Sequence, residues 1–200
     1  MTDVWDEFAD GWDDQPGTGE YAGAAFDSLL TVLGGAGIAL RGACVVDFGC
    51  GTGLLTEKLI GAGAEVIAVD TSPAMLAALR EKADTHGWAG LTATTDLDAV
   101  PERTDLIVCS SVCAFLDDYP ATAARLAGLL RPGGTFVQWD WEREEPDDHG
   151  LTRREVQDAL QGAGLERIEV ATAFEVDVAG QTMRSLIGYG SVPLEPSADA

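Results

Sequence analysis

The most constraining feature of this chain is a short apolar run that ends in an acid and leads into a glycine-rich turn. Residues 45–47, Val-Val-Asp, predict a buried parallel strand. Gly49, Gly51 and Gly53 then turn the chain sharply, and a helix follows. Glycine lets the backbone approach a ligand closely, and the helix directs its free N–H groups and positive dipole end back at the loop. The sequence therefore predicts that an anionic group of a ligand is held at this turn.

A second predicted strand, residues 65–69, ends in Asp70, a carboxylate placed to accept hydrogen bonds from a ribose diol. The spacing of the glycines then separates two classes of ligand. Dinucleotide-binding proteins use the pattern GxGxxG, whose third glycine would fall at Leu54 in this chain. This chain instead has an acid, one further residue and then GxGxG, from Asp47 to Gly53. A glycine-rich turn that binds nothing is the alternative to both.

The acid-led GxGxG, with Asp70 closing the next strand, resembles the first motif of the class I S-adenosylmethionine-dependent methyltransferases. The sequence LLRPGG at residues 129–134, followed by a predicted strand at 135–139, is also typical of that family, and the resemblance covers roughly residues 40–190. It implies an α/β, Rossmann-like, doubly wound sheet of seven strands in the order 3-2-1-4-5-7-6, with the last strand antiparallel and helices on both faces. It also implies S-adenosyl-L-methionine as the cofactor.

The resemblance further implies a cofactor site at the ends of the predicted strands. In the family, an acid after the first strand, the glycine loop and the backbone after the fourth strand meet the methionine part of the cofactor. Residues after the second strand meet the ribose and residues after the third meet the adenine, while the segment that leads the domain folds over the cofactor. The matching residues of this chain are Asp47, Gly49, Cys50, Gly51, Asp70, Thr71, Met75, Asp96, Leu97, Ser110, Trp12 and Tyr21.

Several of these assignments leave alternatives open. Trp12 and Tyr21 fit a second role equally well, packing the first helix onto the sheet. Met75 fits an apolar core position at least as well as a cofactor contact. Asp98 competes with Asp96 as the acid that accepts a hydrogen bond from the exocyclic amine of adenine.

The acid content excludes one class of partner. Asp and Glu number 34 against 12 Lys and Arg, a formal net charge of −22. A surface this negative repels nucleic acid. Residues 109–112, Cys-Ser-Ser-Val, also differ from the Asn/Asp-Pro-Pro-aromatic run of the methyltransferases that act on nucleic-acid bases. The acid excess itself indicates solubility or adaptation to salt, with an acidic partner-binding face as the alternative.

The N-terminus and the lack of a long apolar run indicate a cytoplasmic protein, and the cysteines indicate free thiols. The first residues are acidic without an apolar core, unlike a secretory signal, and no apolar run approaches the length of a membrane span. Cys44, Cys50, Cys109 and Cys113 form no CxxC pair and lie far in sequence from both histidines. Free thiols are therefore expected rather than a metal site or disulfides. The sequence sets no oligomeric state.

The resemblance implies a single methyltransferase domain over residues 1–190, in which residues 1–40 cover the cofactor and residues 41–190 form the core. The prolines and aspartates of residues 191–200 predict a frayed tail. A capping box of Thr152 and Glu155 marks one helix start. The charged connection before it is short, so any lid over the substrate is small. Helices are also predicted at 18–33, from Pro73 onward and at 119–130, and further strands at 91–94, 105–110, 167–177 and 183–190.

Three functions remain open at this point. The first, which the resemblance favours, is a methyltransferase that acts on a small-molecule acceptor by in-line displacement, where positioning supplies most of the catalysis. His149, Asp140 and Tyr189 are candidates for a base or a substrate contact, each with a structural or solvated role as its alternative, and no catalytic residue is assigned. The second is a protein that binds the cofactor without transfer, as a sensor or partner subunit. The third, an NAD-dependent oxidoreductase, is disfavoured by Leu54.

Overall fold

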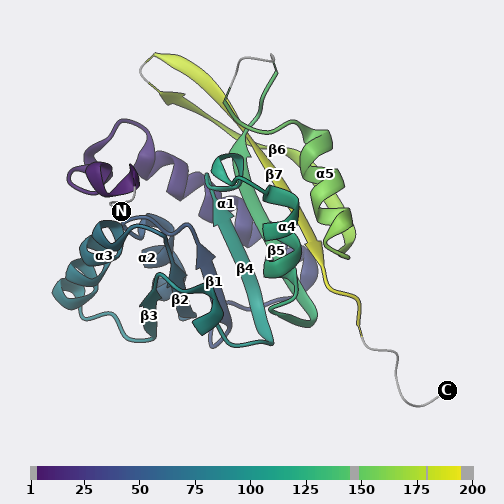
Figure 1. Ribbon diagram of the computed structural model, residues 1–200, viewed down its shortest axis with the longest axis horizontal. Coiled ribbons are helices and arrows are strands. Elements are labelled where there is room, and N and C mark those ends of the chain that lie inside the picture. Colours follow the sequence, from purple (N-terminus) through teal and green to yellow (C-terminus); the bar gives the residue numbers. More distant parts are fainter. Residues whose placement is uncertain (1–3, 145–148, 179, 195–200) are drawn as a thin grey trace.

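One mixed sheet of seven strands runs through the middle of the protein in a computed structural model that describes residues 4–144, 149–178 and 180–194 (Figure 1). The first five strands along the chain pair in parallel, and the last strand is antiparallel to both of its neighbours. The order β3-β2-β1-β4-β5-β7-β6 confirms the predicted topology. The strands are β1 (Cys44–Phe48), β2 (Glu65–Val69), β3 (Leu91–Thr94), β4 (Thr104–Ser110), β5 (Leu130–Trp141), β6 (Glu166–Val178) and β7 (Gln181–Ser191).

Helices cover both faces of this sheet, as predicted (Figure 1). One face carries α1 (Thr18–Ala36), α2 (Leu54–Gly61) and α3 (Pro73–His86), and the other carries α4 (Tyr119–Ala127) and α5 (Arg153–Gly162). Four short 3₁₀ turns accompany them, and they are η1 (Val4–Phe8), η2 (Trp12–Asp14), η3 (Leu97–Ala99) and η4 (Cys113–Phe115).

The central strands are apolar on both sides because helices lie on both sides. In β1, Val45 packs with α1 and α2, whereas the next residue, Val46, packs in the cluster that contains α4 and α5. In β5, Trp139 and Phe136 are fully buried on opposite faces. This continuous burial holds the strand ends in a fixed arrangement, and the ends carry the polar residues of the site.

The start of α5 confirms the predicted capping box. Glu155 donates its backbone N–H to Thr152 Oγ1 at 3.2 Å, and Glu155 Oε2 accepts from the Thr152 backbone N–H at 2.8 Å. Leu151 and Val156 on either side of the cap are buried together in the core.

The predicted end of the helix at residue 130 is wrong. α4 ends at Ala127, and β5 begins at Leu130, so the sequence LLRPGG opens a strand rather than only stopping a helix. The backbone N–H of Thr104 donates to Leu129 O at 2.9 Å and Thr104 pairs with Leu130, which draws this segment onto β4. Two long-range pairings thus override the helical pattern.

Two predicted segments lie partly outside the residues that the structure describes. Residues 145–148 belong to the predicted short lid, between the end of β5 at Trp141 and the start of α5 at Arg153, and residues 195–200 belong to the predicted tail. Among the helices that are described, none is both long enough and apolar enough to cross a bilayer.

Candidate cofactor-binding site

A cavity of about 970 Å³ opens at the carboxyl ends of β1, β2 and β4. The strand order reverses between β1 and β4, which is where open α/β sheets bind their ligands. Small-molecule sites span roughly 300–1,000 Å³, so the cavity has room for a large ligand or for two. All the residues predicted to contact a cofactor line this one cavity, and they are Asp47, Gly49, Cys50, Gly51, Asp70, Thr71, Met75, Asp96, Leu97, Ser110, Trp12 and Tyr21.

The glycine loop lies against the end of β2 because its backbone is bound there. The N–H groups of Gly49 and Cys50 both donate to Val69 O, at 2.8 and 3.1 Å. Gly49 has a φ of 69°, and a Cβ at this position would lie 2.4 Å from Val112 Cγ2. Only glycine therefore lets the loop after β4 pack this closely on the loop after β1.

Gly53, at the start of α2, offers a test of this packing. Its φ is 90°, and a Cβ would lie 2.2 Å from Cδ1 of Leu79, a fully buried side chain. We expect Gly53→Ala to lower the free energy of unfolding by about 2 kcal/mol or more, measured by urea unfolding. Gly42→Ala is the control, since Gly42 has a φ of 76° but open space around it. Equal losses in the two variants would contradict the packing argument.

Asp47, at the end of β1, is a buried carboxylate with one unsatisfied oxygen. Its Oδ2 accepts a hydrogen bond from Thr56 Oγ1 at 2.5 Å, while Oδ1 is buried without a hydrogen-bond partner in the described part of the chain. The pKa of Asp47 is raised to about 7, and burial is the main cause. The hydrogen bond from the Thr56 hydroxyl lowers this pKa, and the nearby Asp70 carboxylate raises it. A buried acceptor without a donor is destabilising, so this oxygen fits a donor supplied by a ligand.

Asp70 joins the glycine loop to the start of α3. Its Oδ2 accepts from the Gly51 backbone N–H at 2.7 Å, and its Oδ1 accepts from the Ser72 backbone N–H at 2.9 Å. Ser72 in turn caps α3, accepting from the Met75 N–H at 3.1 Å. Asp70 is therefore held in place at the cavity wall, between the glycine loop and α3.

The residues before α1 are tied over the cavity by two acids that the sequence analysis did not single out. Asp6 Oδ1 accepts from Ser72 Oγ at 2.6 Å and from the Ala74 N–H at 3.2 Å. Asp13 accepts from Thr52 Oγ1 at 2.5 Å and pairs with Lys82 Nζ at 2.5 Å. Both acids therefore fasten η1 and η2 to the loops that surround the glycine turn.

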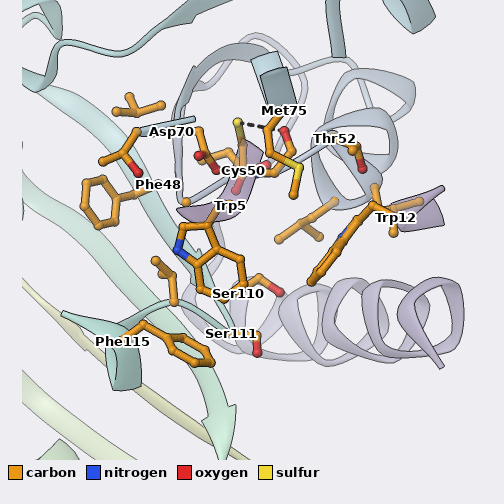
Figure 2. Close-up of a pocket in the computed structure, with 18 of the residues that line it drawn as sticks. Trp5, Trp12, Phe48, Cys50, Thr52, Asp70, Met75, Ser110, Ser111 and Phe115 are labelled. Atoms are coloured by element: carbon orange, nitrogen blue, oxygen red, sulfur yellow. Dashed lines mark hydrogen bonds between the residues drawn. The ribbon is translucent and has the colours of Figure 1, made fainter. Parts of the chain in front are cut away.

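Aromatic rings from this N-terminal segment form one wall of the cavity. Figure 2 shows Trp5 in the middle of the site, with Cys50 on one side and Ser110 and Phe115 on the other. The Trp5 ring lies edge-on to Phe115 at 5.2 Å between centroids, and Trp12 lies edge-on to Trp5 at 6.4 Å. Such edge-to-face pairs hold the rings in a defined arrangement.

The loops after β3 and β4 complete the lining. Asp96 caps η3 by accepting from the Asp98 N–H at 2.9 Å, and Asp98 forms an ion pair with Arg125. The pairing of Asp98 leaves Asp96 as the better acid for a ligand amine. Beside Ser110, Ser111 adopts a φ of 57°, a left-handed conformation that residues other than glycine seldom take.

None of the three candidate bases lines the cavity. His149 is exposed, and the Tyr189 hydroxyl bonds to Glu169 on the neighbouring strand. Asp140 is only 1% exposed and lies behind the cavity wall, accepting from the Ala114 N–H at 3.1 Å and from Gln138 Nε2 at 3.0 Å.

The four cysteines are free thiols. Cys50, Cys109 and Cys113 are buried, and burial raises the pKa of the Cys50 thiol well above its usual range. Among the residues described, no group of three or more His, Cys, Asp or Glu side chains could hold a metal ion.

Comparison with known families identifies the domain. A family model described as a methyltransferase domain matches residues 46–136. These residues are therefore similar to a methyltransferase domain, and the order of the strands is that of the class I S-adenosylmethionine-dependent methyltransferase fold. The matched part of this methyltransferase domain contains all the predicted cofactor residues except Trp12 and Tyr21, which precede it.

Curated relatives are similar to the methyltransferase domain over about half of this chain. The ubiquinone biosynthesis O-methyltransferase of Rhodopseudomonas palustris is 37% identical over 100 residues, 49% of this chain and 40% of the relative. The trans-aconitate 2-methyltransferase of Methylobacterium radiotolerans is 42% identical over 112 residues, 54% of this chain and 42% of the relative. The match thus spans about two fifths of the length of these relatives.

Solved structures share the fold of the methyltransferase domain over most of the chain. The magnesium protoporphyrin IX methyltransferase of Synechocystis, solved with bound S-adenosylmethionine, is 24% identical with a TM-score of 0.65. The similarity covers 86% of this chain and 80% of that chain.

Proposed function

We propose that this chain binds S-adenosyl-L-methionine and transfers the methyl group to a small-molecule acceptor by in-line displacement. The observation that carries the proposal is the buried Oδ1 of Asp47, which lacks a donor beside the glycine loop of a methyltransferase domain. The amino group of the cofactor is such a donor. The names of the relatives, which are methyltransferases acting on different small molecules, support the same reaction class.

Each part of the cofactor would meet a different strand end. The division follows the order of the strands, and it agrees with the pairing of Asp98 to Arg125, which leaves Asp96 for the adenine amine. The assignments are Asp47, Gly49, Cys50, Gly51 and Ser110 for the methionine end, Asp70, Thr71 and Met75 for the ribose, Asp96 and Leu97 for the adenine, and Trp12 and Tyr21 for the cover.

The residues of this chain contribute position rather than acid–base chemistry. The cofactor, when bound, supplies a methyl group that its sulfonium has already activated. The chain holds the two ends of the cofactor at Asp47 and Asp96, and the segment fastened by Asp6 and Asp13 covers the site and excludes water. We assign no residue as a general base.

We further propose that the protein acts in the cytoplasm and that its acceptor is not a nucleic acid. Four free thiols support a reducing compartment. A formal net charge of −22 opposes binding to a phosphate backbone. Within the proposed reaction class, a protein side chain remains an alternative acceptor to a small molecule.

Cofactor affinity is expected to rise with pH because Asp47 holds the amino group as a carboxylate. Its pKa is raised to about 7 by burial, so below pH 7 the ligand must first displace a proton. We expect the Kd for S-adenosylhomocysteine to be about tenfold weaker at pH 6 than at pH 8, measured by calorimetry. Asp47→Asn should bind weakly at both values, and a wild-type Kd that does not change with pH would contradict this role.

The proposed function is tested by calorimetric titration with S-adenosylhomocysteine and, as the matched nucleotide, NAD. Micromolar binding of S-adenosylhomocysteine without binding of NAD supports the proposed cofactor site. Binding of NAD alone would overturn the proposed function in favour of an oxidoreductase. Incubation with S-adenosylmethionine labelled on the methyl group then distinguishes an enzyme from a non-catalytic binding protein. Binding without any labelled product across acceptor classes would identify the latter.

A further inference from the structure

The cavity differs in charge between its two sides. The carboxylates that line it are Asp47, Asp70, Asp96, Asp98 and Asp117, and they lie at or beyond the carboxyl ends of β1, β2, β3 and β4. The side that faces α1 carries no charged side chain among the lining residues described. Its principal residues are Gln15, Thr18, Tyr21, Ala22, Ser111 and Trp141.

Tyr21 and Trp141 form a rigid aromatic wall on this uncharged side. The Tyr21 ring lies edge-on to Trp141 at 4.8 Å and to Phe174 at 5.1 Å between centroids. Its hydroxyl and Ser185 Oγ are 3.2 Å apart and form a hydrogen bond. Burial, followed by the nearby Asp140 carboxylate, raises the pKa of Tyr21 far above its usual value, so the hydroxyl stays neutral.

Ser111 supplies a polar group beside this wall. Its φ of 57° is unfavourable for serine, and the conformation is held by its backbone N–H, which donates to Trp139 O at 2.7 Å. Figure 2 shows Ser111 between the end of β4 and the long helix α1, on the side of the cavity away from Asp70. Ser111 directly follows Ser110, which is assigned to the methionine end of the cofactor.

Among the described residues that line the cavity, no cation is left unpaired to receive an acidic ligand. All 12 Lys and Arg residues of the sequence fall among the described residues, and only Arg125 lines the cavity, where it pairs with Asp98. Three arginines near the C-terminal end of β5 are also paired. Arg143 pairs with Glu155, Arg153 with Glu142, and Arg184 with Glu142, Glu144 and Glu175.

We propose that the acceptor is an uncharged aromatic compound, whose ring lies against Tyr21 and Trp141 and whose hydroxyl is held by Ser111. The proposal rests on the proposed function, because a cofactor that spans Asp47 to Asp96 leaves the α1 side of the cavity for the acceptor. An acidic acceptor would enter a cavity that is lined by five carboxylates and by one cation, Arg125, which already pairs with Asp98, and this is unfavourable. In the transfer an O–CH₃ bond forms as the S–CH₃ bond breaks with its electron pair staying on sulfur, and the hydroxyl proton passes to water.

The test compares two ligands that differ only in one carboxylate. Calorimetry on the protein saturated with S-adenosylhomocysteine measures binding of catechol and of protocatechuate, which is catechol with a carboxylate on the ring. We expect catechol to bind about tenfold more tightly or better. Equal binding, tighter binding of protocatechuate, or failure of both catechol and naphthol to bind would overturn the proposal.

Three variants locate the ligand. Trp141→Leu and Ser111→Ala are expected to weaken catechol binding about tenfold while the affinity for S-adenosylhomocysteine changes less than about twofold. Asp27→Asn, a change at an exposed position of α1 outside the cavity lining, should bind catechol as the wild type does. If both Trp141→Leu and Ser111→Ala bound catechol as tightly as the wild type does, the proposed location of the acceptor would be wrong. Failure of the wild type to bind S-adenosylhomocysteine would instead refute the proposed function. Failure of catechol to bind while S-adenosylhomocysteine still binds would refute the aromatic acceptor alone, so the two failures are distinguishable.

Discussion

Replacement of Asp70 by alanine is expected to weaken binding of S-adenosylhomocysteine about 100-fold, since hydrogen bonds to a charged group contribute about 1.5–3 kcal/mol each. The carboxylate holds the Gly51 N–H at 2.7 Å and the Ser72 N–H at 2.9 Å, and it is the acid proposed to accept from the ribose. Its removal takes away a ligand contact and also frees the glycine loop from α3. We therefore expect a lower free energy of unfolding as well, by about 1–3 kcal/mol.

The matched control is Asp98→Ala. Asp98 lines the same cavity and carries the same charge, but it is exposed and paired with Arg125 rather than bound to the glycine loop. Its removal should change the Kd by less than about threefold, because surface ion pairs contribute little. Calorimetry measures both affinities and urea unfolding measures both stabilities. An Asp70→Ala protein that binds as tightly as the Asp98→Ala protein would refute the ribose assignment.

Replacement of Asp140 by asparagine is expected to stabilise the protein above pH 7. Burial raises the pKa of Asp140 from 3.8 to about 7, although hydrogen bonds from the Ala114 backbone and the Gln138 side chain lower it. Between pH 3.8 and about pH 7, the folded chain therefore keeps a proton on Asp140 that the unfolded chain has released. The corresponding stability is fully present below pH 3.8 and is lost as the pH rises toward 7, by about 4 kcal/mol at most.

An amide at position 140 keeps the neutral form at every pH. The buried network can accommodate it, because the Gln138 amide can reverse and accept from the new amide while donating to the Tyr119 hydroxyl. We expect the variant to exceed the wild type by about 2 kcal/mol at pH 8 and to match it within about 1 kcal/mol at pH 5. Urea unfolding at several pH values measures the difference.

Asp27→Asn removes the same charge from an exposed position of α1 and serves as the control. It should change stability by about 0.5 kcal/mol or less at both pH values. If Asp140→Asn were less stable than the wild type at pH 8, the buried carboxylate would be ionised and stabilising, and the argument from burial would be wrong.

The lining of the cavity was predictable because it depends on local patterns, whereas the sheet order was predicted from the resemblance to the methyltransferase family. The acid-led glycine loop, the carboxylate of Asp70 and the position of Asp96 each follow directly from the end of a strand. Parallel strand ends meet at one edge of a sheet, so residues far apart in sequence converge there without any knowledge of packing.

Features that depend on long-range contacts were not predictable. Asp6 and Asp13 stand among other acids, and only the folded chain shows that they bond to Ser72 and Thr52. The left-handed conformation of Ser111 has no glycine to mark it. The start of β5 at Leu130 was missed because pairing with β4 overrides the helical pattern of LLRPGG. The order of residues along the chain does not directly indicate any of these contacts.

The ion pairs beyond the end of β5 imply an asymmetry in mutational tolerance. With 34 acids and 12 bases, loss of an exposed acid relieves repulsion, whereas loss of a base increases it. Arg184 is the extreme position, since its removal takes from Glu144 and Glu175 the cation that pairs with them and leaves Glu142 with Arg153 alone. In a library of random substitutions, the few arginine positions should therefore tolerate far fewer replacements than the many surface aspartates and glutamates do.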